Sequence, residues 1–290
     1  MTARTPVAGG CMHQAWHVQR AEGAPLFVKT LAAAALPRMV AEAEGLAALA
    51  AAAPPELRIP APLGHGLVDD QAVLVLPWLP FHPHGSSASA WRGLGMNLAR
   101  LHRASLECAC APGDRVDGSV GWPRDNWIGA TPQINGWGGD WGVFFRDHRL
   151  APQLERLAHS GMRLAGIEAM LERVPAWLGS HGAQACLVHG DLWSGNAGVL
   201  AAGQGAIFDP AVYRGDREVD LAMAHLFGGF PDAFFRGYCD TWPLPAGHEQ
   251  RRATYNLYHL INHANLFGGS YGAQAQRVIQ KLLATQPRYS

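Results

Sequence analysis

The most constraining feature of the sequence is the loop His189-Gly190-Asp191-Leu192-Trp193-Ser194-Gly195-Asn196, which follows a short apolar run at residues 185–188. A second apolar run, residues 206–208, ends on Asp209. We expect both runs to be β-strands with the acids at their ends. Two carboxylates with an asparagine between them offer the oxygen ligands that hold divalent cations against a nucleotide. The pattern therefore predicts a centre for phosphoryl transfer.

Each polar side chain of this pattern has a predicted role. Asp191 is placed to orient an acceptor hydroxyl and to take its proton. Asn196 and Asp209 are the predicted Mg²⁺ ligands. The five-residue step from Asp191 to Asn196 matches the protein-kinase pattern H-R-D-x-x-x-x-N, although Gly190 stands where that pattern has arginine.

A lysine and a glutamate in the first part of the chain are candidates for holding the phosphates. Lys29 ends a predicted strand, and a helix is predicted from Pro37 to about Ala52. Glu42 falls on the apolar stripe of that helix, whereas Glu44 points elsewhere. Because an acid in a buried stripe needs a cation, we predict a Lys29–Glu42 pair that holds the α- and β-phosphates of ATP.

Gly9-Gly10-Cys11 forms a predicted bend in the first β-hairpin. Gly9 and Gly10 could let backbone N–H groups approach a phosphate, with an ordinary turn as the alternative. Cys11 lies beside this bend, and we hypothesise that its oxidation blocks ATP binding, an inert cysteine being the alternative.

The order of predicted elements indicates an α+β fold with two lobes. A β-rich N-lobe with one helix covers residues 1–76, with strands at about 63–67 and 72–76. Residues 77–81 are the predicted hinge, where the backbone at Leu76, Pro77, Trp78 and Leu79 would clamp the adenine, with a plain loop as the alternative. A helical C-lobe covers residues 82–290, with a long loop at 109–132 and helices at about 91–101, 140–157, 166–179, 218–227, 246–267 and 271–284.

Composition excludes several partner classes. Lys plus Arg and Asp plus Glu are both 23, so no net charge attracts nucleic acid or an acidic membrane. The hydrophobic content of 48% contains no run long enough for a membrane span, and no secretory leader is recognised. Five cysteines without framework spacing favour a reducing cytoplasm. We expect a cytoplasmic protein, and a monomer is favoured.

These motifs together resemble the fructosamine (ketosamine) 3-kinase family. The resemblance rests on residues 189–196, on Phe208-Asp209-Pro210-Ala211 and on Gly215-Asp216-Arg217-Glu218-Val219-Asp220-Leu221-Ala222, and it extends over nearly the whole chain. It implies a protein-kinase-like, aminoglycoside-phosphotransferase-like fold with ATP and Mg²⁺ as cofactors. It also implies phosphorylation of the 3-hydroxyl of a small or protein-attached ketosamine, a deglycation reaction whose labile product releases the amine.

Carried onto this sequence, the resemblance implies the roles already given to Asp191, Asn196, Asp209, Lys29 and Glu42. Trp193, with Ser194, is a candidate for binding the sugar, plain packing of the ring being the alternative. Asp220 is expected to hold the catalytic-loop backbone, and Asp216 to cap a helix. His259 and His263 share one helix face and are interpreted as polar packing, and metal sites at Cys108-Ala-Cys110 or His82-Pro-His84 are disfavoured.

Two other functions remain open at this point. The first is a phosphotransferase of the same fold that acts on an aminoglycoside or a choline-like alcohol. The second is a catalytically silent nucleotide-binding module, against which the joint presence of Asp191, Asn196, Asp209 and Lys29 argues.

Overall fold

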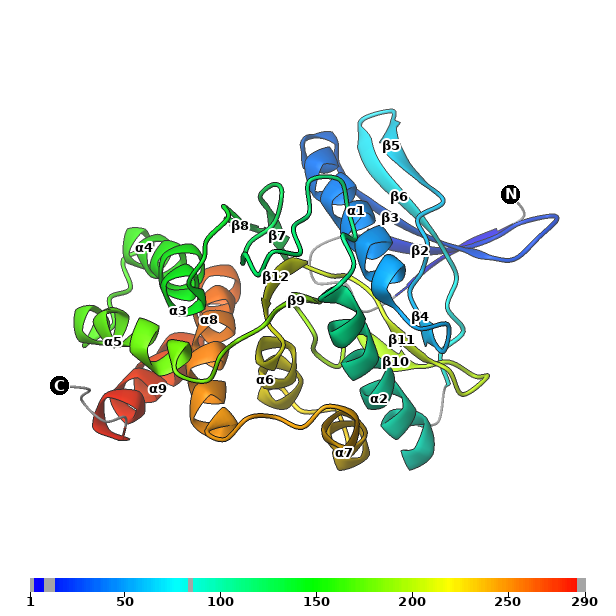
Figure 1. Cartoon of the computed structure of the whole chain (residues 1–290). Coiled ribbons are helices and arrows are strands. Elements are labelled where there is room, and N and C mark those ends of the chain that lie inside the picture. Colours follow the sequence, from blue (N-terminus) through cyan, green and yellow to red (C-terminus); the bar gives the residue numbers. More distant parts are fainter. Residues whose placement is uncertain (1–2, 8–13, 83–85, 286–290) are drawn as a thin grey trace.

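The computed structural model describes residues 3–7, 14–82 and 86–285, which form a β-rich part and a helical part (Figure 1). The β-rich part contains an antiparallel five-stranded sheet in the order β1-β2-β3-β6-β5. Its strands are β1 (Ala3–Pro6), β2 (Gln14–Gln19), β3 (Leu26–Ala32), β5 (Gly64–Val68) and β6 (Gln71–Pro77).

One helix, α1 (Leu36–Ala52), packs on this sheet after a 3-10 turn, η1 (Ala33–Ala35). Pro37 lies in its first turn, where the missing N–H costs nothing. Met39, Leu46 and Leu49 are buried, which confirms the predicted apolar stripe.

The helical part begins with α2 (Ala88–Ser105), which confirms the helix predicted at about 91–101. The remaining helical segments are α3 (Trp141–Phe144), the π-helical turn η2 (Phe145–Leu150), α4 (Ala151–His159), α5 (Ile167–Gly179), α6 (Glu218–Leu226), α7 (Asp232–Thr241), α8 (His248–Phe267) and α9 (Tyr271–Thr285).

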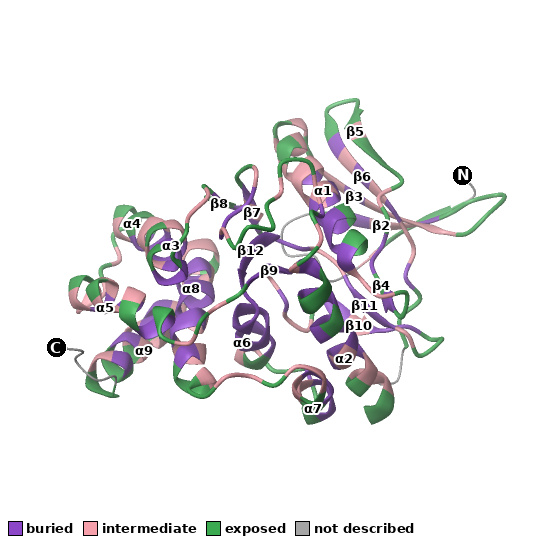
Figure 2. Ribbon diagram, viewed as in Figure 1, coloured by how far each residue is buried: buried purple, intermediate pink, exposed green. Residues whose placement is uncertain are grey.

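Short strands between the two parts carry the polar loop. Strand β9 (Ala185–Val188) pairs antiparallel with β12 (Tyr213–Asp216). Strands β10 (Ala197–Val199) and β11 (Gly205–Ile207) form a second sheet with β4 (Leu57–Arg58), which pairs parallel to β11. Because β4 precedes the predicted hinge in sequence, this sheet joins the two parts independently of the hinge. All residues of β9, β11 and β12 are buried, so this region lies in the core of the molecule (Figure 2).

The structure differs from the sequence-based expectations at α7 and in the loop at 109–132. Helix α7 was not predicted, since it starts after Pro231 with no side chain capping its first N–H groups. The predicted loop at 109–132 contains β7 (Asn126–Ile128) and the start of its hairpin partner β8 (Thr131–Gln133). The helix predicted at 166–179 is present as α5, with Pro175 inside it.

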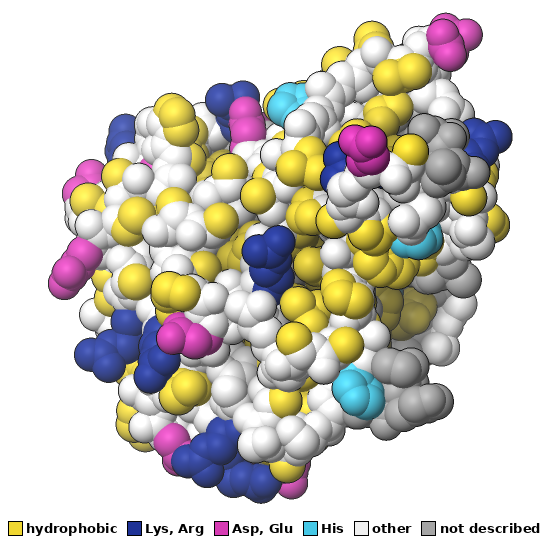
Figure 3. Space-filling model, turned by 90° about the vertical axis from the view of Figure 1, so that its right-hand side faces the viewer, with side chains coloured by type: hydrophobic (Ala, Val, Ile, Leu, Met, Phe, Trp, Pro, Cys, Tyr) yellow, Lys and Arg dark blue, Asp and Glu magenta, His cyan; other side chains and the backbone are white. Residues whose placement is uncertain are grey.

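Charges of both signs are interspersed with hydrophobic side chains on the face shown in Figure 3. Within the described part of the chain, no helix has the length and apolar character that a membrane span requires.

Candidate active site

A cavity of about 800 Å³ lies between the β-rich part and the helical part, and most of the predicted site residues line it. Lys29, Glu42, Asp191, Trp193, Asn196 and Asp209 are all among its lining residues. The fold thus brings together side chains from β3, α1 and the two loops that follow β9 and β11.

The predicted contact between Lys29 and Glu42 is present. Lys29 Nζ donates to Glu42 Oε1 over 2.7 Å, and it also contacts the carboxylate of Asp209. Burial lowers the pKa of Lys29, and the Glu42 carboxylate opposes this shift. Glu44 points elsewhere, as predicted, and pairs with Arg124 over 3.0 Å.

The backbone of the loop before Asp191 is held in a conformation that requires glycine. Gly190 has φ +81°, and a Cβ added there would lie 2.1 Å from the carbonyl oxygen of Ala211. The neighbouring His189 has a pKa lowered by burial, so its ring is neutral, and it donates from Nε2 to the Phe208 carbonyl over 2.9 Å. Its Nδ1 therefore accepts from the Asp191 N–H. These contacts tie the Asp191 loop to the segment that carries Asp209.

Asp191 has the electrostatics of a general base. Burial raises its pKa to about 7, a hydrogen bond from Asn196 opposes the shift, and the negative charge of Asp220 adds to it. A base with a pKa near the working pH is largely deprotonated and still basic enough to accept a proton from the substrate. The carboxyl group therefore has a pKa suited to proton transfer at neutral pH.

Asn196 and Asp209 form a donor set that fits Mg²⁺. Asn196 Nδ2 lies 2.9 Å from the backbone carbonyl of Asp191 and 3.2 Å from its carboxylate, so the amide nitrogen faces Asp191. The amide oxygen of Asn196 and the carboxylate of Asp209, which both line the cavity, are oxygen donors of the kind that Mg²⁺ prefers. Asp209 has φ +58°, a left-handed conformation that few residues other than glycine adopt.

Asp220 binds the backbone of the catalytic loop, as predicted. Its carboxylate accepts the backbone N–H groups of His189 and Gly190 over 2.7 and 2.8 Å. His102 Nε2 lies 3.1 Å from the same carboxylate, and Tyr238 bonds the other ring nitrogen of His102. Burial alone would raise the pKa of Asp220, but His102 and these hydrogen bonds hold it below its usual range.

The predicted adenine clamp also lines the cavity at Leu76, Pro77, Trp78 and Leu79. Trp78 donates its N–H to the Pro25 carbonyl over 3.1 Å, and proline has no N–H. Among the described residues, the N–H of Leu79 has no protein acceptor, so it is the clamp donor left for a ligand.

Three glycine-bend predictions fall outside the part of the chain that the structure describes: Gly9, Gly10 and Cys11. His84 of the disfavoured His82-Pro-His84 site lies outside it as well. The Cys110 thiol donates to the backbone carbonyl of Cys108 over 3.2 Å.

The two candidates for sugar binding lie differently. The Trp193 ring covers Gly195, where an added Cβ would lie 2.3 Å from ring atoms, and it lines the cavity. Ser194 is not among the residues that line the cavity; it packs against Gly229. We predicted that both residues bind the sugar. In the structure, only Trp193 lines the cavity, and Ser194 contacts Gly229 instead.

Sequence reasoning missed the wall of the cavity that the helical part supplies. This wall comes from the end of α6, from α8 and from α9, and it is formed by Phe227, Asn262, His263, Leu266, Phe267 and Tyr271. Both histidines are packed in the helical part, as predicted: His259 is buried, and His263 contacts aromatic rings while it also lines the cavity. Their shared helix face was the available signal, since His263 lies one turn further along it.

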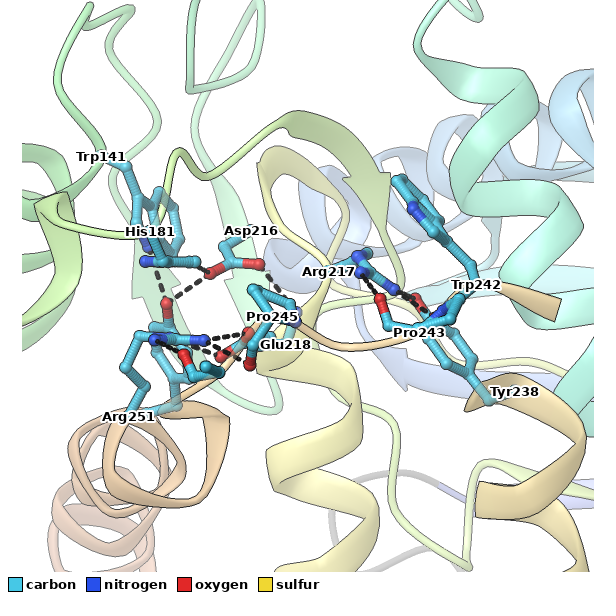
Figure 4. Close-up of polar contacts among 12 residues, drawn as sticks. Trp141, His181, Asp216, Arg217, Glu218, Tyr238, Trp242, Pro243, Pro245 and Arg251 are labelled. Atoms are coloured by element: carbon cyan, nitrogen blue, oxygen red, sulfur yellow. Dashed lines mark hydrogen bonds and ion pairs between the residues drawn. The ribbon is translucent and has the colours of Figure 1, made fainter. Parts of the chain in front are cut away.

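Asp216 lies away from the cavity, in a buried polar cluster (Figure 4). Asp216 is not the predicted helix cap, because the N-cap residue of α6 is Arg217. Asp216 accepts the Glu218 N–H over 3.0 Å, and it also bonds His181 and the Tyr255 hydroxyl over 2.6 Å each. Glu218 in turn makes a two-point ion pair with Arg251. Although His181, Asp216 and Glu218 are spaced as metal ligands could be, Arg251 already supplies the cation.

Comparison with known proteins gives a consistent result. The sequence profile of the fructosamine kinase family matches residues 1–285. A "probable ketoamine kinase" of Synechocystis sp. is 42% identical over 97% of this chain and 90% of its own length. The chloroplastic protein-ribulosamine 3-kinase of Oryza sativa subsp. japonica is 33% identical over 98% of this chain and 79% of its own length.

Solved structures extend the comparison to the fold. A protein of Haemophilus somnus, provisionally named fructosamine-3-kinase, superposes with a TM-score of 0.85 at 26% identity, covering 97% of this chain and 91% of that one. An amicoumacin kinase solved with AMP-PNP and Ca²⁺ has a TM-score of 0.62 at 12% identity, covering 98% and 89% of the two chains, and it shows a shared kinase-like fold.

Proposed function

The chain belongs to the fructosamine kinase family, and we propose that it transfers the γ-phosphoryl group of ATP to the 3-hydroxyl of a ketosamine. The observation that carries this proposal is the position of Asp191. It is a carboxyl group with a pKa of about 7 on the wall of a cavity that also holds Lys29, Asn196 and Asp209.

The nucleotide is assigned to the side of the cavity formed by the β-rich part. We propose that the Leu79 N–H binds the adenine and that Lys29, held by Glu42, neutralises the phosphates. Asn196 and Asp209 would hold Mg²⁺, which supplies positive charge against the charge that develops on the transferred group. The segment at Gly9 and Gly10 keeps its predicted role beside the phosphates.

Asp191 is assigned the proton transfer. Its carboxylate would accept a hydrogen bond from the 3-hydroxyl, orient that oxygen toward the γ-phosphorus and take the proton as the new bond forms. Asn196 keeps the carboxylate oriented through its Nδ2 group. Asp220 acts at one remove, because it fixes the backbone of the preceding residues.

The cavity wall favours a sugar over a polycationic acceptor. Among the described residues, the only acids that line the cavity are Glu42, Asp191 and Asp209, and all three have roles toward ATP or the reacting proton. A site for aminoglycosides needs further acids to bind several ammonium groups. Trp193 offers an aromatic face on which a sugar ring can stack, so we propose it as the sugar-binding residue.

The decisive experiment measures ADP release with fructoselysine, ribuloselysine and an aminoglycoside panel, for the parent and for Asp191→Asn. We expect turnover with a ketosamine and a loss of about 10²- to 10⁴-fold in kcat for the variant, the range for removal of a general base. Turnover of aminoglycosides alone would overturn the assigned substrate, and full activity of Asp191→Asn would overturn the assigned base.

Nucleotide affinity provides the control for this experiment. Because Asp191 is assigned to the acceptor hydroxyl, Asp191→Asn should bind ADP as tightly as the parent in calorimetry. If parent and variant both bind ADP and neither turns over any ketosamine or aminoglycoside, the protein is a nucleotide-binding module and not a kinase.

A further inference from the structure

The cavity contains a cluster of aromatic rings for which the proposed transfer step gives no role. The rings belong to Phe227, His263, Phe267 and Tyr271, and all four line the cavity from the helical part. The His263 ring lies at the centre, with ring centroids 4.6 Å from Phe227, 5.6 Å from Phe267 and 5.1 Å from Tyr271. Phe227 and Tyr271 meet edge to face at 6.3 Å.

The hydrogen bonding of His263 determines which nitrogen it offers to a ligand. Its Nδ1 lies 2.8 Å from the carbonyl oxygen of His259. Since a carbonyl oxygen can only accept, Nδ1 carries the proton. Burial lowers the pKa of His263, so the ring is neutral at pH 7 and its Nε2 is an unprotonated acceptor.

The cluster is thus suited to a cation. Aromatic faces attract positive charge through their quadrupole, and the neutral imidazole adds a lone pair. Within the described part of the chain, no Arg or Lys lies over any of these four rings, so their faces are not already used by a side-chain cation. No carboxylate belongs to the cluster, which distinguishes it from a site that binds cations by ion pairing.

A ketosamine carries such a cation close to its reacting hydroxyl. Its amine is attached to carbon 1, next to the carbonyl carbon that adjoins carbon 3, and it is a secondary ammonium at neutral pH. Resting on the proposed function, we propose that His263 Nε2 accepts a hydrogen bond from this ammonium and that the faces of Phe227, Phe267 and Tyr271 surround it. His263 is thereby a specificity-determining residue that selects ketosamines over the corresponding neutral ketoses.

The test compares two acceptors that differ only in the group attached to carbon 1, which is a cationic hydrogen-bond donor in one and a neutral ether in the other. One is the fructosamine of propylamine, and the other is 1-O-propylfructose, in which a neutral ether oxygen replaces the ammonium. For His263→Phe at pH 7, we expect kcat/KM for the fructosamine to fall about 10- to 100-fold through KM, as for loss of a hydrogen bond to a charged group. The value for the ether should stay within about threefold of the parent.

Two further variants distinguish loss of the hydrogen-bond acceptor at residue 263 from a general effect of replacing a histidine. His263→Gln retains a carbonyl acceptor and should recover most of the affinity for the fructosamine. His159→Phe is the matched control, because His159 makes the same Nδ1 contact to the carbonyl one turn earlier, over 2.9 Å, but is exposed on α4. This control should leave both substrates unchanged.

The possible outcomes are distinct. An equal loss for the fructosamine and the ether, or no loss for either, would overturn the ammonium subsite while leaving the kinase assignment intact. A parent enzyme that phosphorylates neither acceptor would overturn the proposed function and the subsite with it.

Discussion

Asp191 belongs to the loop at 189–196, and Asp220 binds the backbone of the same loop. The environments of these two carboxyl groups shift their pKa values in opposite directions. Burial acts on both in the same sense and favours the neutral acid. Asp220 is buried and is bonded by two backbone N–H groups and by His102, which reverses the shift. Asp191 has one side-chain donor, Asn196, and its pKa stays raised.

The difference teaches how to recognise a reactive acid in this fold. A carboxylate whose oxygens are fully hydrogen-bonded stabilises the structure and has no capacity left for a substrate. A carboxylate with few bonds, in a cavity, is kept ready for a proton at some cost to stability. We therefore assign Asp220 to structure and Asp191 to chemistry.

Substitution of the two acids gives the largest expected contrast. Asp220→Ala should lower the free energy of unfolding by about 3 kcal/mol or more, because two buried N–H groups and His102 lose their acceptor. Asp191→Asn should change it by less than about 1 kcal/mol, since burial already disfavours the charged form. Urea unfolding followed by tryptophan fluorescence measures both values, and an equal loss in the two variants would contradict the distinction.

Substitution of Gly190, in the same loop as Asp191, gives the next largest expected loss of stability. Gly190→Ala places a Cβ against the Ala211 carbonyl in a left-handed backbone, and we expect a loss of about 1–3 kcal/mol in unfolding free energy together with reduced kcat. Gly203→Ala is the matched control, because Gly203 has φ +85° and open space around its Cβ position. If the two variants lose the same stability, the close approach at Ala211 has no energetic importance.

The smallest of these expected effects is the change of kcat/KM with pH. With a pKa of about 7, the Asp191 carboxylate is lost as the pH falls through 7, so kcat/KM should be roughly tenfold lower at pH 6 than on its alkaline plateau. Steady-state rates at fixed ionic strength measure this profile. The residual rate of Asp191→Asn should be flat over the same range, and a flat parent profile would mean that Asp191 is not the titrating base.

Much of the site could be predicted from local spacing. The five-residue step from Asp191 to Asn196, the strand end at Asp209 and the inward face of Glu42 are properties of short segments, and their side chains do meet at the cavity. The family resemblance drawn from the same motifs is confirmed by the match over residues 1–285. Helix α7 and His263 were not recognised, because α7 lacks a capping signal and His263 acquires its place only when α6, α8 and α9 converge.

By itself, the sequence determined the chemistry, because the residue types and their spacing define which groups can hold phosphate, Mg²⁺ and a proton. The tertiary structure alone decided what state those groups are in. The pKa of Asp191, the hydrogen-bonded state of Asp220 and the neutral tautomer of His263 depend on burial and on partners far away in the chain. Desolvation and hydrogen bonding are properties of the folded environment, and no local pattern of residues encodes them.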